Sequence, residues 1–139
     1  MMVRSSEIKF KTRGAGDIVD LTPELRNIIR ETEIDSGTVT VFTPSATSGL
    51  TTIEYEPGLL QDLPQLMERI IPSGREYHHD ATWHDGNGFS HLRSALIGPG
   101  LTIPFNDSEL TLGTWQQVVF LEFDNRPRQR RVNLQIIGE

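Results

Sequence analysis

All four histidines of the chain lie in one short segment, as His78, His79, His84 and His91. Imidazole titrates near neutral pH and is the commonest metal-binding side chain in proteins. His79, His84 and His91 are not spaced as a helical zinc motif is, but a glycine-containing loop could bring their nitrogens to one point. Three protein nitrogens with an open fourth position are typical of a catalytic metal site. The sequence therefore predicts a metal site formed by His79, His84 and His91.

Carboxylates near these histidines could complete the site. Asp80, Asp85 or Glu54 could add an oxygen ligand or orient an imidazole. In a metal-dependent hydrolase, Asp80 or Glu54 would act as the general base. The alternative is that the histidines cap turns, stack on Trp83 or lie in solvent. Because the chain has no cysteine, any metal must be held by nitrogen and oxygen, and thiolate catalysis is excluded.

A glycine-rich turn follows the third histidine. Gly86, Asn87 and Gly88 come directly after Asp85, and glycine and asparagine tolerate the positive φ angles of a tight turn. The backbone N–H groups of such a turn can also approach a phosphate closely, and the helix expected to begin near Ser90 would add its positive end. The segment is thus either a simple turn or a phosphate-binding loop.

A local basic patch lies near the C-terminus of a chain whose net charge is −6. It consists of Arg126, Arg128, Arg130 and Arg131. In a strand, Arg128 and Arg130 share one face and Arg131 takes the other. Either the patch is a solvated edge strand protected by charge, or Arg126 and Arg130 bind a phosphate or carboxylate.

Alternating and helical hydrophobic patterns indicate the elements that must position these residues. Thr22 as N-cap and Pro23 at the first turn predict a helix start, and a second helix is expected from Pro57 to about Pro72. A short third helix is predicted over 91–97, and extended segments over 6–12, 38–43, 50–54, 101–105, 113–124 and 130–137. The predicted fold class is α+β: a mainly antiparallel, β-sandwich-like sheet with two to three helices in one compact domain, residues 1–139.

Composition limits the class of protein. No apolar run approaches the roughly 20 residues of a membrane helix, and the N-terminal residues lack the apolar segment of a signal peptide. A cytoplasmic protein without membrane or nucleic-acid partners is expected, since the net charge of −6 disfavours general nucleic-acid binding. Trp115 favours a core position, and its neighbour Gln116 must be hydrogen bonded if it is buried.

Several strings of residues together carry a resemblance to a known family. They are Val41–Pro44, Thr47, Glu54, His79, Asp85–Asn87, His91–Arg93, Gly98–Pro99, Ile103–Pro104, Glu109–Gln116, Glu122–Asp124 and Arg126–Arg131. Over nearly the whole chain, from about Glu7 onward, the sequence resembles the YjbQ-like family, also called the secondary thiamine-phosphate synthase family. In this comparison His79 and His91 match the family's two later histidines, and Glu54 matches its acidic residue. Asp62 and the pair Trp115–Gln116 also match.

The resemblance implies a compact α+β homotrimer whose polar histidine site binds a metal or an anion near the subunit interface. It implies a transferase that joins an aminopyrimidine diphosphate to a thiazole phosphate, forming thiamine phosphate and releasing diphosphate. His79, His91, Glu54 and Asp80 are then the candidate catalytic residues. The candidate phosphate-binding residues are Gly86, Asn87, Gly88, Arg126, Arg130 and Gln116.

The cofactor implied is a divalent metal, for which a site of imidazoles favours Zn²⁺, whereas diphosphate chemistry usually recruits Mg²⁺. One position departs from the family pattern, because Ser45 stands where relatives commonly have histidine. His84, which lies outside that pattern, could replace the missing imidazole in space. The alternatives are a metal-dependent hydrolase of small phosphorylated substrates and a non-enzymatic trimer that binds a metal or an anion.

Overall fold

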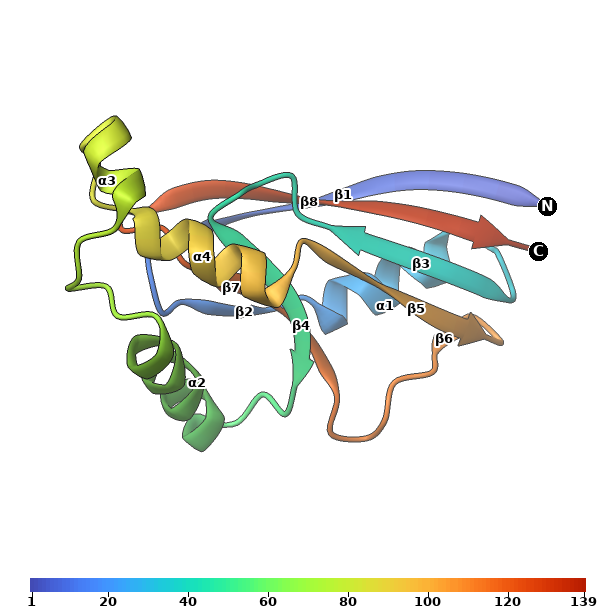
Figure 1. Cartoon of the computed structure of the whole chain (residues 1–139). Coiled ribbons are helices and arrows are strands. Elements are labelled where there is room, and N and C mark those ends of the chain that lie inside the picture. Colours follow the sequence, from blue (N-terminus) through green and yellow to red (C-terminus); the bar gives the residue numbers. More distant parts are fainter.

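The computed structural model describes all residues from Met1 to Glu139, arranged as eight strands and four helices (Figure 1). The helices are α1 (Thr22–Glu31), α2 (Pro57–Ile70), α3 (His78–Trp83) and α4 (Gly88–Ile97). The strands are β1 (Met2–Thr12), β2 (Ile18–Asp20), β3 (Gly37–Phe42), β4 (Ser48–Ile53), β5 (Gly100–Asn106), β6 (Glu109–Leu110), β7 (Gln117–Glu122) and β8 (Arg128–Gly138).

The strands form two antiparallel sheets. The larger sheet has the order β1-β8-β3-β5-β6, and the smaller has the order β2-β7-β4. In the larger sheet β1 pairs with β8 along its whole length, from Met2 opposite Gly138 to Thr12 opposite Arg128. The β3 ladder is shorter, and its last pair places Phe42 opposite Asn133. The first five residues of β8 therefore have a strand neighbour on one side only.

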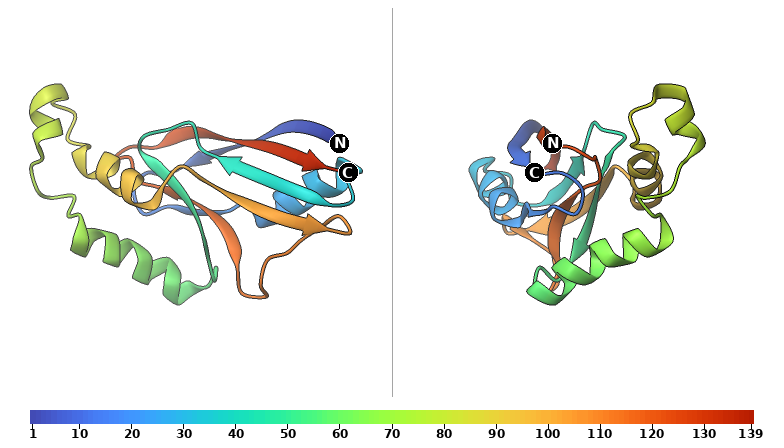
Figure 2. Two further views of the ribbon diagram at one scale, coloured as in Figure 1. Left: turned by 45° about the vertical axis from the view of Figure 1, so that its right-hand side comes forward. Right: turned by 90° about the vertical axis from the view of Figure 1, so that its left-hand side faces the viewer.

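The core lies between the two sheets and extends to both sides of β7. Val118 and Phe120 of β7 pack into the main cluster, which includes Leu25 and Ile29 of α1. The alternate residue Val119 faces a second cluster. Because successive side chains of a strand point to opposite faces, β7 is buried on both of them. Figure 2 shows α1 on one side of the sheets and α2 with α4 on the other.

The α+β class, the antiparallel sheets and the compact domain agree with the sequence prediction, with three differences in detail. The structure has four helices because His78–Trp83 forms the short helix α3, which the sequence predicted as loop. β8 as a whole lies between β1 and β3, but its arginine segment, 128–131, precedes the β3 ladder and pairs with β1 alone, so the edge-strand interpretation holds for this end of the strand only. The predicted core position of Trp115 was also wrong, since its side chain lies in the turn before β7 and is 70% exposed.

Local hydrogen bonds explain a fourth, smaller difference at the start of α1. The N-cap position is Leu21, and Thr22 is the first helical residue. The Thr22 hydroxyl accepts a hydrogen bond from the Val118 N–H at 2.8 Å, so it anchors the helix to β7 instead of capping it. The Thr22 N–H donates to the Asp20 carboxylate at 3.0 Å, which supplies the missing cap.

No helix of the protein combines the length and the apolar character that spanning a membrane requires.

Candidate functional site

Two short helices bring His79 and His91 together. His79 lies on α3 and His91 on α4, and their ring centroids are 4.3 Å apart at a tilt of 38°. The chain between the helices turns sharply, since His84 has φ 59° and Gly86 has φ 67°. The Asn125 side-chain N–H donates to the main-chain oxygen of Asp85 at 3.0 Å and fastens this turn to the turn between β7 and β8.

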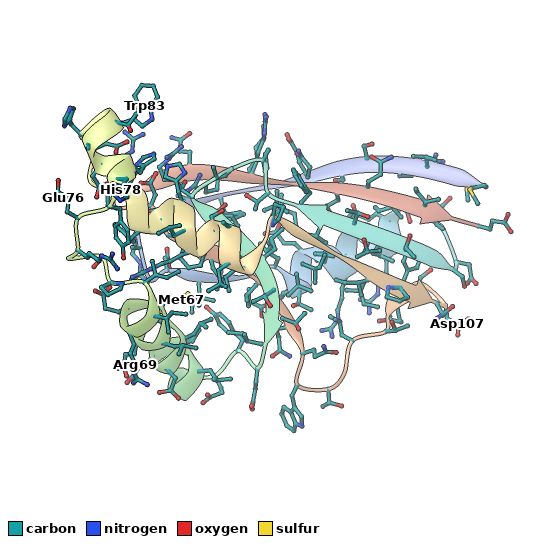
Figure 3. The ribbon with its side chains drawn as sticks, viewed as in Figure 1. Met67, Arg69, Glu76, His78, Trp83 and Asp107 are labelled. Carbon is teal, nitrogen blue, oxygen red and sulfur yellow. The ribbon has the colours of Figure 1, made fainter.

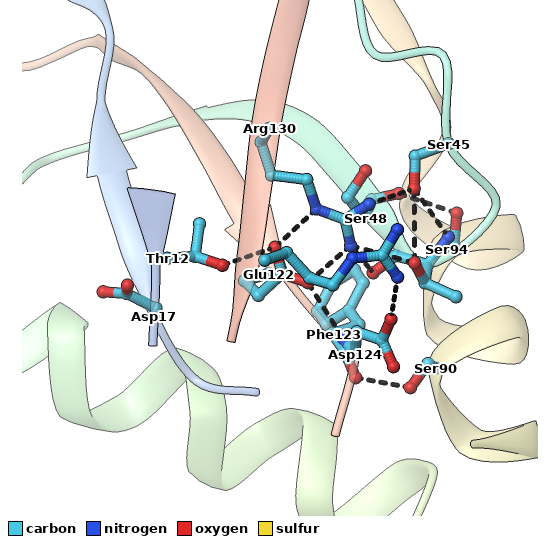
Figure 4. Close-up of polar contacts among 12 residues, drawn as sticks. Thr12, Asp17, Ser45, Ser48, Ser90, Ser94, Glu122, Phe123, Asp124 and Arg130 are labelled. Carbon is cyan, nitrogen blue, oxygen red and sulfur yellow. Dashed lines mark hydrogen bonds and ion pairs between the residues drawn. The ribbon is translucent and has the colours of Figure 1, made fainter. Parts of the chain in front are cut away.

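Buried serines hold α4, and with it His91, in place. The Ser90 hydroxyl donates to the main-chain oxygen of Phe123, and the Ser94 hydroxyl donates to that of Ser48 at 2.6 Å (Figure 4). Arg93 is 4% exposed and donates to the main-chain oxygen of Ile71 near the end of α2. These bonds tie α4 to β4, to the residue that follows β7 and to the end of α2, so His91 lies on a rigid element.

Asp80 is fixed by two backbone donors. Its carboxylate accepts from the Tyr77 N–H at 2.9 Å and from the Gly88 N–H at 2.9 Å. These hydrogen bonds, that of Tyr77 first, hold the pKa of Asp80 below its ordinary value of 3.8 and keep the side chain ionised. A Cβ on Gly88 would lie 2.9 Å from the Tyr77 Cβ and 3.0 Å from an Asp80 carboxylate oxygen. Glycine at this position therefore allows the close approach of α3 and α4.

The candidate metal centre consists of His79, Asp80 and Asp85, whose potential ligand atoms all lie within 4.8 Å of one another. The Nδ1 atom of His79 is 4.0 Å from an Asp80 oxygen and 3.8 Å from an Asp85 oxygen. Both distances exceed a hydrogen bond, and Nδ1 is a buried side-chain atom with no hydrogen-bond partner. An unsatisfied buried nitrogen is costly, so this position favours a bound group.

The donor set fits a divalent cation. One imidazole nitrogen and two carboxylate oxygens are ligands for Zn²⁺, and the carboxylates also suit Mg²⁺ and Mn²⁺. Asp85 is about half exposed, whereas Asp80 is largely covered, so the group opens to solvent on the Asp85 side. The Asn87 amide steadies this second carboxylate, with its nitrogen 2.8 and 3.1 Å from the two Asp85 oxygens in the orientation that satisfies both groups.

The other predicted site residues lie apart from this group. His84 is the left-handed C-cap residue of α3 and is exposed, as are His78 and Trp83, and Figure 3 shows Trp83 at the outer end of α3. Glu54 follows β4, whose end lies away from α3 in both Figures 1 and 2. Glu54 lines a separate cleft of about 410 Å³ with Trp115. Gln116 is exposed and accepts a hydrogen bond from the Gly113 N–H at 2.9 Å.

The predicted phosphate ligands are partly engaged within the chain. The Gly88 N–H is occupied by Asp80, and Arg126 is exposed in the turn before β8. Arg130 is buried and binds Glu122 through two guanidinium nitrogens. It also donates to the hydroxyl groups of Ser45 and Thr47, both at 2.9 Å (Figure 4). Thus Ser45 belongs to a buried network around Arg130.

A second buried acid continues this network toward the turn of Asp85. Asp124 pairs with Arg128 and accepts from the Asn125 N–H at 2.8 Å. Burial raises the pKa of Asp124, but the hydrogen bonds from Arg128 and Asn125 outweigh burial and hold the pKa below the ordinary 3.8. Because Asn125 also contacts Asp85, the arginines of β8 and the candidate metal centre lie at the same end of the fold.

Sequence reasoning missed an open basic cleft of about 600 Å³ beside this network. Its lining residues are Lys9, Phe10, Lys11, Thr43, Pro44, Ser45, Arg128, Gln129, Arg130 and Arg131. The alternation Lys9-Phe10-Lys11 in a strand was a signal, since it places both lysines on one face. Only the pairing of β1 with β8 reveals that this face lies beside the arginines.

Comparison with known proteins finds sequence relatives that share one family description. The model of the family described as UPF0047 protein YjbQ-like matches residues 6–139. A UPF0047 protein of Archaeoglobus fulgidus is 40% identical over 126 residues, covering 91% of this chain and 95% of the relative. A UPF0047 protein of Methanothermobacter thermautotrophicus is 32% identical over 139 residues, covering 100% of this chain and 95% of the relative.

Solved structures share the fold. A hypothetical protein of Aeropyrum pernix superposes with a TM-score of 0.86 at 28% identity, covering 96% of this chain and 99% of that one. A YbjQ-like protein of unknown function from Sulfolobus solfataricus has a TM-score of 0.88 at 24% identity, covering 99% and 100% of the two chains. The sequence match over almost the entire length and the shared fold lead to one conclusion: the chain belongs to the YjbQ-like UPF0047 family.

Proposed function

We propose that this protein is a divalent-metal-dependent enzyme that acts on phosphorylated small molecules, with His79, Asp80 and Asp85 as the metal-binding group. The observation that carries the proposal is the buried Nδ1 atom of His79, which has no hydrogen-bond partner and lies beside two carboxylates. A cation there would satisfy the nitrogen and offset the repulsion between the carboxylates. His91, whose ring packs against His79, would orient the imidazole.

The donor set removes a chemical conflict that the sequence left open. Three imidazoles would favour Zn²⁺ over the Mg²⁺ that diphosphate chemistry usually recruits. One imidazole with two carboxylates accepts Zn²⁺ and also provides the oxygen ligands that Mg²⁺ prefers. The proposed site is therefore compatible with substrates that carry diphosphate groups.

Within this class, we propose the transferase reaction that the family resemblance implies, in which an aminopyrimidine diphosphate and a thiazole phosphate form thiamine phosphate and diphosphate. A bound divalent cation supplies charge compensation for the leaving diphosphate. The chain's own residues would hold the two substrates in reacting orientation and provide further positive charge. The arginines of β8, which lie at the same end of the fold as the proposed metal centre, support this assignment of positive charge to the chain's own residues.

Metal content tests the proposed centre. Elemental mass spectrometry of the purified protein should find a divalent metal at close to one per chain. His79→Ala and Asp85→Asn should lose the metal, because each removes a proposed ligand. His84→Ala is the matched control: it should retain the metal, whereas the three-histidine site predicted from the sequence requires its loss. Metal retained in full by His79→Ala would overturn the proposed centre.

Product analysis tests the reaction. The protein with metal is incubated with both precursors and with each alone, and thiamine phosphate and diphosphate are quantified. Equal amounts of the two products, formed only when both precursors are present, support the transferase. Phosphate released from either precursor alone would replace the transferase with the metal-dependent hydrolase.

We also propose that the protein associates with itself, as the homotrimer that the resemblance implies. Leu92 and Leu96 lie one turn apart on α4 and are 47% and 59% exposed. Adjacent exposed leucines on a helix that is otherwise well anchored are typical of a surface that a partner covers. Sedimentation of the purified protein measures the assembly directly.

A further inference from the structure

The basic cleft concentrates the positive charge of an acidic protein. The chain has net charge −6, yet five of its 13 lysines and arginines line this one cleft, together with no acidic residue. Both lysines of the chain, Lys9 and Lys11, are among them. Such a local excess of one sign focuses the electrostatic field on ligands of the opposite charge.

Three of the five cations are already paired. Lys9 pairs with Glu7, Arg128 with Asp124 and Arg130 with Glu122. Lys11 and Arg131 form no ion pair, and both side chains are exposed. The cleft therefore retains two unpaired positive charges, which match a ligand group that carries two or more negative charges.

The strand register brings the unpaired cations onto one face. Lys9 is the cross-strand partner of Arg131, and Lys11 is the partner of Gln129. Paired residues of an antiparallel ladder project to the same side, where their Cβ atoms are close neighbours. Lys11 is therefore the diagonal neighbour of Arg131 on this face, within reach of long side chains, and the two unpaired like charges repel each other. An anion bound between them would reverse the sign of this interaction.

The loop after β3 provides the second wall. β3 ends at Phe42, and residues 43–45 diverge from β8 without any main-chain hydrogen bond to residues 128–131. Alternate residues of β8 consequently direct N–H and C=O groups to that side without a strand partner. The loop presents the Ser45 hydroxyl, which Arg130 holds in position at 2.9 Å. Backbone N–H groups, a hydroxyl and fixed cations are the donors that bind phosphate oxygens.

From these observations we propose that this cleft binds the phosphate or diphosphate group of a small molecule, with Lys11 and Arg131 as its principal ligands. The inference deepens the proposed function, on which it rests only for the assumption that the substrate is phosphorylated. A small molecule fits better than a nucleic acid, because the cleft is bounded by a loop and the surface beyond it carries the negative charge of Glu7. Its volume of about 600 Å³ is that of a small-ligand site.

The two lysines allow a direct footprint of the cleft. The protein is acetylated with an amine-reactive reagent in the presence of a chelator, with or without inorganic pyrophosphate, and each site is followed by mass spectrometry. The Met1 amino group, which pairs with Glu139 at the other end of β1, is the internal control. At a pyrophosphate concentration about ten times the dissociation constant, acetylation of Lys11 should slow about tenfold, with Met1 unchanged.

Variants and competitors make the footprint specific. Arg131→Gln should abolish the protection of Lys11, whereas Arg69→Gln, which removes an exposed arginine on α2, should leave it intact. Sulfate at equal ionic strength should protect much less than pyrophosphate. Unchanged acetylation of Lys11 with saturating pyrophosphate would overturn the proposal, as would equal protection by sulfate or equal slowing at Met1. Tighter protection by an oligothymidylate than by pyrophosphate would replace it with a nucleic-acid site.

The metal content of Arg131→Gln separates this inference from the proposed function. Arg131 is not a proposed metal ligand, so the variant should keep the metal while losing pyrophosphate protection. The footprint is made with a chelator present, so protection of Lys11 does not depend on bound metal. If Lys11 is protected but metal analysis finds no bound metal, the cleft is upheld and the metal centre is refuted. A protein that binds metal but shows no protection would refute the cleft alone.

Discussion

Replacing Arg130 by methionine should strongly destabilise the protein through the acid it leaves behind. Glu122 is 1% exposed, and its carboxylate receives hydrogen bonds from two nitrogens of Arg130, from the Thr12 hydroxyl at 3.0 Å and from the Asp124 N–H at 3.2 Å. In Arg130→Met only the last two remain, and the buried charge has no counter-ion. Breaking a buried ion pair in this way costs about 3–5 kcal/mol.

This loss is large relative to the stability of a single domain, which is about 5–15 kcal/mol. For a chain of this size it corresponds to a decrease in Tm of about 6–20 °C. Urea unfolding, followed by circular dichroism, measures the free energy directly, and a calorimetric scan gives Tm. The matched control is Arg30→Met, which removes an ion pair with Glu109 whose side chains are 53% and 55% exposed. An exposed pair of this kind contributes less than about 1 kcal/mol.

A second substitution isolates the charge from the lost packing. Glu122→Gln combined with Arg130→Met removes the uncompensated charge. Thr12 and Asp124 donate to different oxygens of Glu122, so in the double variant the amide oxygen accepts from the Asp124 N–H and the amide nitrogen donates to the Thr12 hydroxyl oxygen. The double variant should therefore recover most of the stability lost in Arg130→Met. Two results would refute the reasoning: equal losses for Arg130→Met and Arg30→Met, or a double variant no more stable than Arg130→Met alone.

Three further predictions concern acid stability, the site and assembly. Arg128 and Asn125 lower the pKa of Asp124, so the ionised carboxylate stabilises the folded protein above the ordinary pKa of 3.8, and this stabilisation is lost as pH falls through the lower pKa of the folded state. Asp124→Asn should therefore reduce the dependence of Tm on pH in thermal scans from about pH 2 to 6, and an unchanged dependence would contradict the prediction. Gly88→Ala should lower the unfolding free energy by about 1–3 kcal/mol and weaken metal retention, because the new Cβ would crowd the carboxylate that Gly88 binds. Gly74→Ala, with no atom within 4 Å of its Cβ, is the control, and equal behaviour of the two variants would exclude that explanation. Leu92→Glu should shift sedimentation from trimer toward monomer, and an unchanged trimer would place the interface elsewhere.

The sequence predicted those elements whose apolar residues have a regular period. The spacing of Leu63 and Met67 indicated α2, and both pack in the second core cluster. In contrast, α3 has no buried residue, so it leaves no hydrophobic period to detect. It is held by two hydrogen bonds, from the Tyr77 N–H to the Asp80 carboxylate and from the Asp80 N–H to the main-chain oxygen of Tyr77, and tyrosine is not a residue that propensity favours at the start of a helix.

The same distinction explains the site. His79 and His91 were predicted to meet and do so, because the chain between their helices is short enough to fold back. His84 was expected to join them, but its left-handed conformation at the end of α3 could not be inferred without that helix. The cleft was missed because Lys11 and Arg131 are separated by 120 positions, and only long-range pairing joins them. The prediction that three histidines bind a metal remains to be tested against the His79, Asp80 and Asp85 group.

The pairing of β1 with β8 has a consequence for how the protein is made. β1 ends at Thr12 and its partner β8 begins only at Arg128, so during synthesis β1 waits on the order of ten seconds before it can pair. During synthesis its charged residues, Arg4, Lys9 and Lys11 among them, would limit pairing with other nascent chains. Long-range closure of this kind also slows folding. By this reasoning the lysines of the cleft would protect the growing polypeptide, a role separate from the ligand binding proposed for them.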